Sequence, residues 1–267
     1  MSPLKNLLYW LGNVAKSRIV AEILAASPGP EPVTIFDYGC GEGGDWPHIL
    51  TDHPHLRLIG YEPYGPSYRR ATEQLRGHAA EVLTGADLNA LTVEARYIVS
   101  FSVFEHVLQR DKFLRQAKRI LAPNGMFYLN YDDGHFRNLL DVSRFATWLP
   151  ALRAWARNVL SVPSGAVGRQ LNYQRRVEAK HADRLAVEAG FYIERVDYHN
   201  LLCLKEIAKT MPEYLRQAYA QWWLDTEQAL NERFRLELTL PLYGDTTNLW
   251  RQMVSRTLCL RHQPQTN

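Results

Sequence analysis

Hydrophobic residues follow two patterns in the first half of this 267-residue chain. Short, nearly continuous apolar runs are typical of strands buried on both faces of a sheet. They lie at residues 33–38, 56–62, 80–83, 97–102 and 126–131. Between them, apolar residues three and four positions apart predict helices near 67–76 and over 111–121. This alternation of strands and helices favours a parallel, doubly wound α/β sheet.

The alternation is less regular in the second half of the chain. Residues 132–175 contain no convincing strand and predict a mostly helical insertion. A helix at 181–189 then leads through a glycine into a strand at 191–198. A second helical insertion is expected at about 201–250, and residues 252–260 predict a final strand.

The N-terminal region predicts a helical arm. Apolar residues at helical spacing over 4–26 end at Ser27-Pro28-Gly29-Pro30, where the prolines and the glycine stop the helix. We expect an arm of residues 1–30 ahead of a main domain of residues 31–267, into which both helical insertions are set. The arm either packs beside the sheet or closes as a lid over a bound ligand, and the sequence leaves both interpretations open.

The turn after the first predicted strand carries most of the functional information. Residues 33–38 end at Gly39-Cys40-Gly41, where glycines permit positive φ and let a ligand approach the backbone closely. Asp45 is placed to cap the next helix, and Pro47 fits its first turn. A strand, a glycine turn and a helix start together predict a ligand site at the carboxyl edge of an α/β sheet.

The glycines alone are compatible with two classes of cofactor. Gly39, Gly41 and Gly44 fit the pattern G-x-G-x-x-G of dinucleotide-binding proteins. Glu62 follows at the distance of about 20 residues that is expected of an acid that binds ribose. On this evidence a nucleotide-dependent oxidoreductase remains an alternative.

Acidic residues around the glycines favour the other class. A dinucleotide places its pyrophosphate at the helix N-terminus, where free N–H groups attract anions. Here Glu42 and Asp45 occupy that position, and Asp37 precedes it. Carboxylates would repel a pyrophosphate but attract an ammonium and a sulfonium. The sequence therefore predicts S-adenosylmethionine as the cofactor.

Five segments resemble the class I S-adenosylmethionine-dependent methyltransferases, especially the broad ubiquinone-biosynthesis-type group that acts on small molecules. They are residues 37–43, 60–62, 86–88, 102–107 and 113–125. The resemblance implies a Rossmann-like seven-stranded sheet of order 3-2-1-4-5-7-6, with the last strand antiparallel. Asn124 replaces a glycine of the family pattern, and asparagine also tolerates the left-handed conformation.

The resemblance also implies which residues bind the cofactor. Asp37 would receive its ammonium group, and Glu62 would accept hydrogen bonds from both ribose hydroxyls. Asp87 would accept from the adenine amino group, and Leu88 would pack on the ring, although aspartate is also common in turns. The full set that we predict is Asp37, Gly39, Cys40, Gly41, Glu62, Pro63, Asp87, Leu88 and Ser102.

Two histidines are candidate catalytic residues. Methyl transfer needs a base only when the acceptor brings its proton into the reaction. His106 follows the fourth strand at the carboxyl edge, where it either takes that proton or only orients the cofactor. His135 follows the fifth strand beside Asp132 and Asp133, which suits a base, a substrate contact or turn chemistry. His199, a lone histidine after the sixth strand, is expected to be structural.

Composition limits the remaining choices. The net charge of +3 is too small to indicate nucleic-acid binding. Cys40, Cys203 and Cys259 lie far apart, without the spacing of metal ligands, which favours a reducing, cytoplasmic setting and no bound metal. No run approaches the ~18 apolar residues that span a bilayer, and residues 1–10 lack the cleavage site of a signal peptide.

We therefore predict an S-adenosylmethionine-dependent methyltransferase that acts on oxygen or nitrogen of a small-molecule acceptor, such as a natural product, a sugar or a lipid-like compound. A non-catalytic protein that binds the cofactor is a further alternative. The insertions carry aromatic residues at helical spacing, including Trp148, Trp155 and Trp222-Trp223. These residues suit core packing, a pocket for the acceptor, contact with a membrane surface or a homodimer interface.

Overall fold

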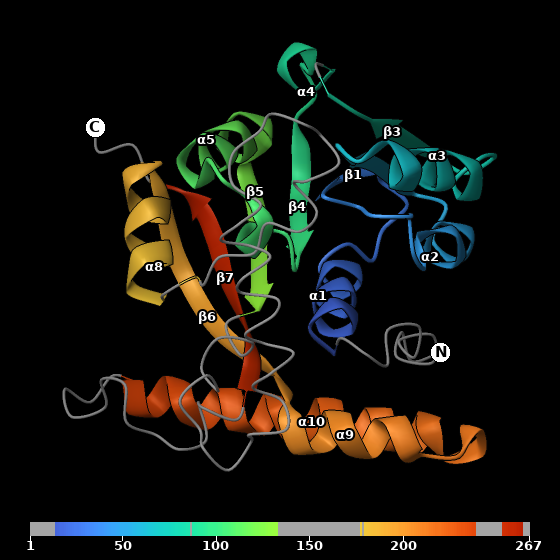
Figure 1. The fold of residues 1–267 in the computed structure, drawn as a ribbon, viewed down its shortest axis with the longest axis vertical. Coiled ribbons are helices and arrows are strands. Elements are labelled where there is room, and N and C mark those ends of the chain that lie inside the picture. The colour runs from blue at the N-terminus through green and yellow to red at the C-terminus, as the bar shows by residue number, and fades with distance from the viewer. Residues whose placement is uncertain (1–13, 86, 133–176, 178, 239–252, 264–267) are drawn as a thin grey trace, which may run out of the picture.

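A computed structural model describes residues 14–85, 87–132, 177, 179–238 and 253–263 (Figure 1). Helices and strands alternate as the sequence predicts. The first half contains α1 (Val14–Ala25), β1 (Val33–Tyr38), α2 (Trp46–Asp52), β2 (Leu56–Tyr61), α3 (Gly65–Gln74), β3 (Ala80–Leu83), α4 (Asp87–Ala90) and β4 (Ala95–Phe101). There follow the 3₁₀ turn η2 (Phe104–His106), α5 (Arg110–Ile120), β5 (Leu121–Asp132), α8 (Ala179–Glu188), β6 (Phe191–Leu201), α9 (Leu202–Thr210), α10 (Glu213–Leu238) and β7 (Met253–His262).

The strands form one seven-stranded sheet of order β3-β2-β1-β4-β5-β7-β6, which confirms the predicted order. β1 pairs in parallel with both β2 and β4, and β7 runs antiparallel to both β5 and β6. The carboxyl ends of β1, β4, β5 and β6 therefore meet at one edge. In Figure 1 the arrowheads of β4 and β5 point towards α10, which crosses below that edge.

Both faces of the sheet are buried, because the central strands are apolar on both sides. On one face α1 and α2 cover the sheet, with Ile23 and Trp46 packed against Val99. On the other face α5 and α8 supply Phe113 and Ala186 to the second half of the core. The continuous apolar run of β4 therefore reflects its position between two layers of helices.

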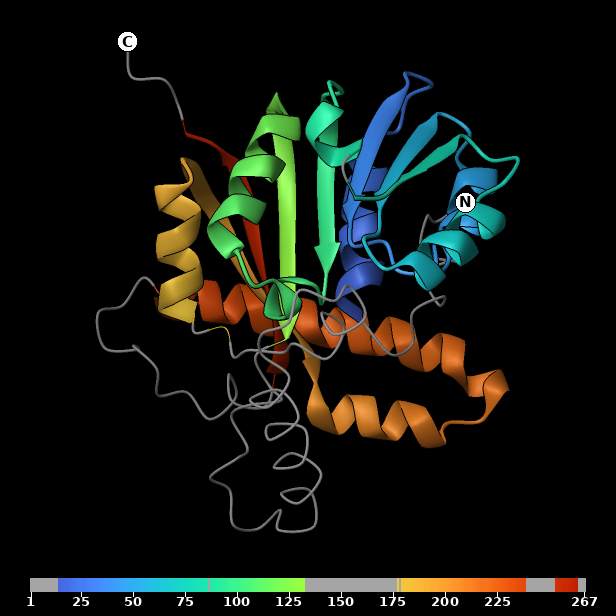
Figure 2. The ribbon, with the colours of Figure 1, turned by 45° about the horizontal axis from the view of Figure 1, so that its top comes forward.

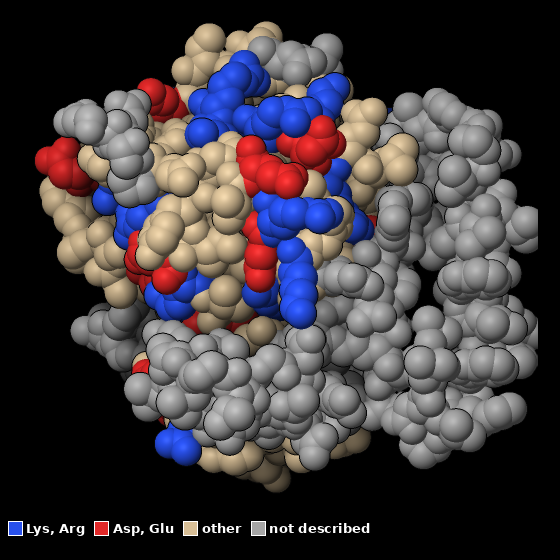
Figure 3. Space-filling model, turned by 90° about the vertical axis from the view of Figure 1, so that its left-hand side faces the viewer, with Lys and Arg blue, Asp and Glu red and all other residues tan. Residues whose placement is uncertain are grey.

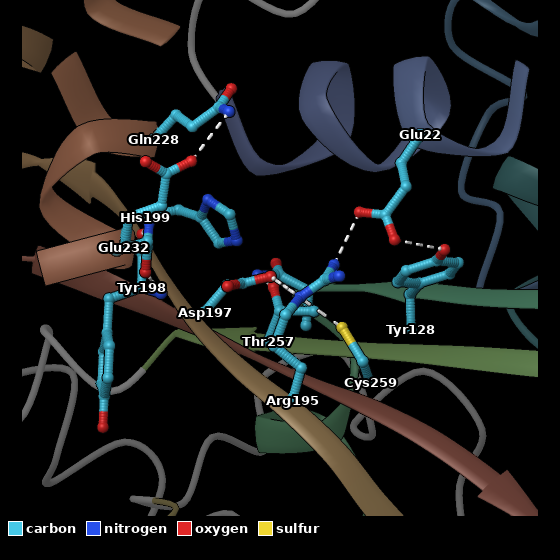
Figure 4. A network of polar contacts seen from close by, with 12 residues as sticks. Glu22, Tyr128, Arg195, Asp197, Tyr198, His199, Gln228, Glu232, Thr257 and Cys259 are labelled. Carbon is cyan, nitrogen blue, oxygen red and sulfur yellow. Dashed lines mark hydrogen bonds and ion pairs between the residues drawn. The ribbon is translucent and has the colours of Figure 1, made fainter. Parts of the chain in front are cut away.

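Helix α1 is fixed to the sheet by charge as well as by packing. The carboxylate of Glu22 accepts a hydrogen bond from the Tyr128 hydroxyl at 3.0 Å and pairs with Arg195 at 2.6 Å (Figure 4). At the other end of the helix, the Val14 N–H donates to the side-chain oxygen of Asn200 at 2.9 Å. The described part of the predicted arm thus packs beside the sheet over β5 and β6.

The segment between β6 and β7 contains the long helix α10, which lies alongside α9 (Figure 2). Of the aromatic residues expected there, Trp223 is fully buried against Tyr198 and Met253. Trp222 and Tyr214 are exposed. The adjacent tryptophans therefore divide between core packing and the surface, as helical geometry requires of neighbouring positions.

One local prediction was wrong, and two other positions have a conformation that the sequence did not define. Asp45 occupies the cap position of α2, but its side chain makes no capping hydrogen bond, because the backbone there is not extended. Asn124 has no positive φ, since α5 ends at Ile120 and the chain enters β5 directly at Leu121. Asp87 and Leu88 begin the short helix α4 instead of lying in an open turn.

On the described surface, positively and negatively charged side chains lie close together. Figure 3 shows Lys and Arg interleaved with Asp and Glu on one side of the molecule, so that face offers no continuous basic stripe. Exposed pairs such as Arg115 with Asp111 and Arg184 with Glu188 follow the same pattern. In the described part of the chain, no helix is both long and apolar enough to cross a bilayer.

Candidate cofactor-binding site

The turn after β1 has the conformation that its glycines predict. Gly39, Gly41 and Gly43 have φ of 88°, 60° and 93°, which only glycine adopts without strain. The N–H groups of Gly39 and Cys40 both donate to the Tyr61 carbonyl, at 2.8 and 3.0 Å. The turn is thus held against the end of β2, with its backbone open to a close approach.

Position 39 also requires glycine because there is no room for a side chain. A Cβ at Gly39 would lie 2.4 Å from a methyl group of Val103, which belongs to the loop after β4. On β2, a Cβ at Gly60 would lie 2.8 Å from the Cys40 sulfur. These contacts pack the ends of β1, β2 and β4 directly against one another.

Asp37 lies in this turn as a buried carboxylate with one free oxygen. Its Oδ2 accepts a hydrogen bond of 2.8 Å from the Trp46 indole, whereas Oδ1 has no hydrogen-bond partner among the described residues. Burial raises the pKa of Asp37 to about 6, although Lys16 and the Trp46 hydrogen bond oppose that shift. An ammonium group at Oδ1 would satisfy the free oxygen and favour its ionised form.

Glu62 follows β2 and points back over the glycine turn. Its Oε2 accepts from the Gly41 N–H and its Oε1 from the Tyr64 N–H, both at 2.9 Å. Burial raises the pKa of Glu62, and these two N–H groups oppose the shift. Each oxygen keeps a second lone pair, so a carboxylate held in this way fits a pair of ribose hydroxyls.

Lys16 on α1 belongs to the same site, and sequence reasoning missed it. Its Nζ lies 5.3 Å from the ring centroid of Phe101, the last residue of β4. Burial raises the pKa of Asp37, Cys40 and Asp45, and the positive charge of Lys16 opposes that rise at all three. A lysine on an amphipathic helix gives no signal in the sequence, because such residues usually face solvent.

The residues after β4 complete the edge. Ser102 has φ of 55°, a strained value for a residue with a side chain, and its N–H donates to the Asn130 carbonyl at 3.1 Å. Glu105 and His106 lie in η2, Glu105 buried and His106 half-buried. The structure therefore brings His106 to the predicted edge, and a role as base stays a prediction.

The other predicted residues differ in what the structure says of them. Cys40 is half-buried against Gly60, Pro63 is exposed, and Leu88 is buried in the core. Asp87 is placed at the start of α4, but its side chain is not among those described. His135 lies outside the described residues. Within the described part of the chain, no cluster of three acidic, histidine or cysteine side chains has the arrangement of a metal site.

The acidic residues that follow the glycine turn have basic neighbours. Glu42 forms an ion pair with Arg70 of α3, so its charge is largely neutralised at the turn. Asp45 is half-buried, and Lys16 acts on it from α1. Glu42 and Asp45 therefore each have a basic neighbour, and Asp37 and Glu62 add two carboxylates inside the site.

Comparison with known proteins agrees with this geometry. Residues 13–195 match the family of methyltransferase domains. The chain belongs to this family. A malonyl-[acyl-carrier protein] O-methyltransferase from Geobacter sulfurreducens is 26% identical over 196 residues, 69% of this chain and 68% of the relative. A ubiquinone biosynthesis O-methyltransferase from Methylobacterium is 30% identical over 114 residues, 38% of this chain and only 42% of the relative.

Solved structures of methyltransferases and related enzymes share the fold. A cyclopropane synthase from Mycobacterium tuberculosis is 17% identical, with a TM-score of 0.54 over 92% of this chain and 84% of its own. A phosphoethanolamine N-methyltransferase from Haemonchus contortus, solved with S-adenosylmethionine, gives 0.54 at 14% identity, over 93% of this chain and 52% of its own. The family match makes S-adenosylmethionine the cofactor of this methyltransferase, and the free Oδ1 of Asp37, the carboxylate of Glu62 and the glycine turn fit that cofactor.

Gly39→Ala tests the crowding between β1 and β4. We expect it to lower the free energy of unfolding by about 2–4 kcal/mol, because left-handed strain adds to a clash with Val103. Gly77→Ala is the matched control, since Gly77 has a similar φ of 86° with nothing within 4 Å of a Cβ. Chemical denaturation measures both, and an equal loss in the two variants would show that backbone strain alone is responsible.

The raised pKa of Asp37 predicts opposite effects on ligand binding and on stability. Affinity for S-adenosylhomocysteine should be flat above about pH 6 and should fall by up to tenfold per pH unit below it, because the protonated carboxyl no longer attracts the ammonium. The stability that protonated Asp37 provides is complete below about pH 4 and is lost as pH rises through 6.

Asp37→Asn should therefore stabilise the ligand-free protein at pH 7 by up to about 3 kcal/mol, weaken ligand binding and remove its pH dependence. Calorimetry and thermal unfolding between pH 5 and pH 8 measure these effects. An affinity in the wild-type protein that is unchanged across this range would contradict the assignment of Asp37 to the ammonium.

Proposed function

We propose that this methyltransferase transfers a methyl group to an oxygen or nitrogen of a small-molecule acceptor. The main support for this proposal is the arrangement of Asp37, Glu62 and Lys16 around one glycine turn, at the edge of the sheet that α10 crosses. Both relatives reported above are named O-methyltransferases, which supports oxygen before nitrogen. Family membership decides against the oxidoreductase alternative.

The residues of the site would bind and orient the donor. S-adenosylmethionine supplies an electrophilic methyl group on its sulfonium. Asp37 would hold the ammonium, and Glu62 would hold the ribose hydroxyls. Positioning of this kind accelerates an in-line transfer by holding the reacting atoms in line, and the buried edge excludes water from them. If the acceptor carries a proton, His106 is our candidate to remove it.

Lys16 completes the recognition of the amino-acid part of the donor. A free amino acid presents an ammonium and a carboxylate about two bonds apart, so its receptor needs a carboxylate and a cation close together. Asp37 and Lys16 provide that pair, because Lys16 lies near enough to lower the pKa of Asp37. Asp37 is positioned by β1, and Lys16 is positioned by helix α1 of the N-terminal arm.

Calorimetry with S-adenosylhomocysteine tests the proposed function. We expect a single site, and we expect radiolabelled S-adenosylmethionine to transfer its methyl group to members of a panel of phenols, amines and carboxylic acids. Absence of binding at millimolar ligand would contradict the cofactor site. Tight binding with no transfer to any acceptor would favour the non-catalytic alternative.

Lys16→Gln tests the proposed carboxylate contact. We expect a loss of about 5–30-fold in affinity for S-adenosylhomocysteine, corresponding to about 1–2 kcal/mol for a partly buried charged hydrogen bond. Decarboxylated S-adenosylhomocysteine, which keeps the ammonium, should bind the variant and the wild-type protein equally well. Lys16→Arg is the control that keeps the charge. A similar loss for both ligands would assign Lys16 to the structure of the turn instead.

A further inference from the structure

A layer of polar side chains lies on the α1 face of β5, β7 and β6, where apolar residues would be expected. We call it the polar layer, and its strand residues are Asn130, Arg195, Asp197, His199, Ser255 and Thr257. They face the same side because Asn130 and Asp197 pair with Thr257, and His199 pairs with Ser255. Helices α1 and α10 cover this layer.

One part of the polar layer attaches the covering helices to the sheet and is structural. Arg195 pairs with Glu22 of α1 at 2.6 Å and with Asp197 at 2.7 Å (Figure 4). Asn231 of α10 accepts from the Tyr198 N–H at 2.6 Å and donates to its carbonyl at 2.7 Å. These bonds account for the attachment of α1 and α10 to the sheet.

The part nearest the carboxyl edge is different. His199 is 1% exposed, and neither ring nitrogen has a hydrogen-bond partner among the described residues. Glu227 of α10 lies opposite, with its Oε2 3.8 Å from the Nδ1 of His199 and likewise without a hydrogen bond. The side-chain oxygen of Asn130 is a further buried atom of this kind. Each such atom costs about 1–3 kcal/mol, and native proteins keep few of them.

These unsatisfied atoms belong to the edge that binds the cofactor. The Asn130 carbonyl accepts the N–H of Ser102, which follows β4 in the candidate cofactor site. His199 immediately precedes Asn200, which has φ of 61°. In the described part of the chain, Ser102 and Asn200 are the two residues other than glycine with positive φ. Backbone strain of this kind concentrates at functional sites.

The chemistry of the polar layer selects the group that would bind there. The free oxygens of Glu227 and Asn130 accept hydrogen bonds, and a neutral imidazole donates one and accepts one. Glu227 and Asp197 act on His199 directly, and Arg195, Arg18 and Glu22 lie further along the same layer, so carboxylates outnumber guanidinium groups there. This balance does not favour an anion. Trp223, Leu201 and Met253 supply an apolar surface in the neighbouring cluster.

We propose that His199 and Glu227 form a subsite that binds a neutral hydroxyl group of a largely apolar methyl acceptor. The hydroxyl donates to the free oxygen of Glu227 and accepts from the imidazole of His199. This inference rests on the methyltransferase function proposed above and defines where the acceptor lies relative to the donor. His199 is then a binding residue, contrary to the structural role expected from the sequence.

Nuclear magnetic resonance of the full-length protein with ¹⁵N-labelled histidine tests the subsite. Phenol and benzoate are the probes, because they share a ring and differ in the hydroxyl and the carboxylate. With S-adenosylhomocysteine bound, phenol should shift the imidazole signals of His199, identified by their loss in His199→Leu, and equimolar benzoate should not. Signals that phenol leaves unmoved, or that benzoate shifts equally, would overturn the proposal.

A pair of variants separates binding from structure. His199→Leu replaces an unbonded side chain, so the melting temperature should stay within about 2 °C of wild type or rise. Asn231→Leu, in the same buried layer, removes three hydrogen bonds and should lower it by several times that amount. A loss in His199→Leu as large as in Asn231→Leu would show a structural role.

The His199→Leu variant also separates this subsite from the cofactor site. Affinity of His199→Leu for S-adenosylhomocysteine should remain within twofold of wild type, since Lys16, Asp37 and Glu62 are intact. A tenfold loss of that affinity would overturn the proposal, because it would place His199 in the donor site. Absence of S-adenosylhomocysteine binding in the wild-type protein would instead contradict the proposed function.

Discussion

The carboxyl edge of the sheet depends on turns held in left-handed backbone conformations. Gly39 and Ser102 follow β1 and β4, and Asn200 is the last but one residue of β6; their φ values are 88°, 55° and 61°. Each is tied to a neighbouring segment: the N–H of Gly39 donates to Tyr61, that of Ser102 donates to Asn130, and the side chain of Asn200 accepts from Val14. Surrounding bonds of this kind are what allow strained backbone to persist.

These turns explain why the functional side chains come together. A strand that ends in a sharp turn exposes its last side chains and backbone at the edge of the sheet instead of continuing into solvent. Parallel neighbours end at the same level, so Asp37, Glu62 and the residues after β4 become close although they are far apart in sequence. The crowding of Gly39 against Val103 then couples the donor turn to the loop that follows β4.

Much of the fold was predictable because its signals are local. The apolar runs gave the strands to within a few residues, and the motifs around Gly39 and Glu62 gave the strand order through a family resemblance. Predictions failed where tertiary structure decides the outcome. Asp45 has the identity of a cap without the backbone for it, and Asn124 lies at the start of a strand that begins earlier than its apolar run.

The site was less predictable, because its partners come from distant elements. Lys16 reaches Asp37 from a helix whose sequence resembles any amphipathic arm, and Glu42 has its charge offset by Arg70. His199 is isolated in the sequence because Glu227 lies 28 positions away, on a helix that turns back over the sheet. Pairings of this kind follow from topology, which no local pattern contains.

Unsatisfied polar atoms connect the stability of this protein to its chemistry. Asp37 and His199 are both buried with free atoms, and each lies beside a turn with left-handed backbone. The protein would be more stable with apolar or neutral side chains at these positions, since an unbonded buried polar atom is destabilising. Such groups are compensated when a ligand supplies the missing bonds, as an ammonium would at Asp37. The same reasoning, applied to His199 and Glu227, supports the proposed acceptor subsite between β6 and α10.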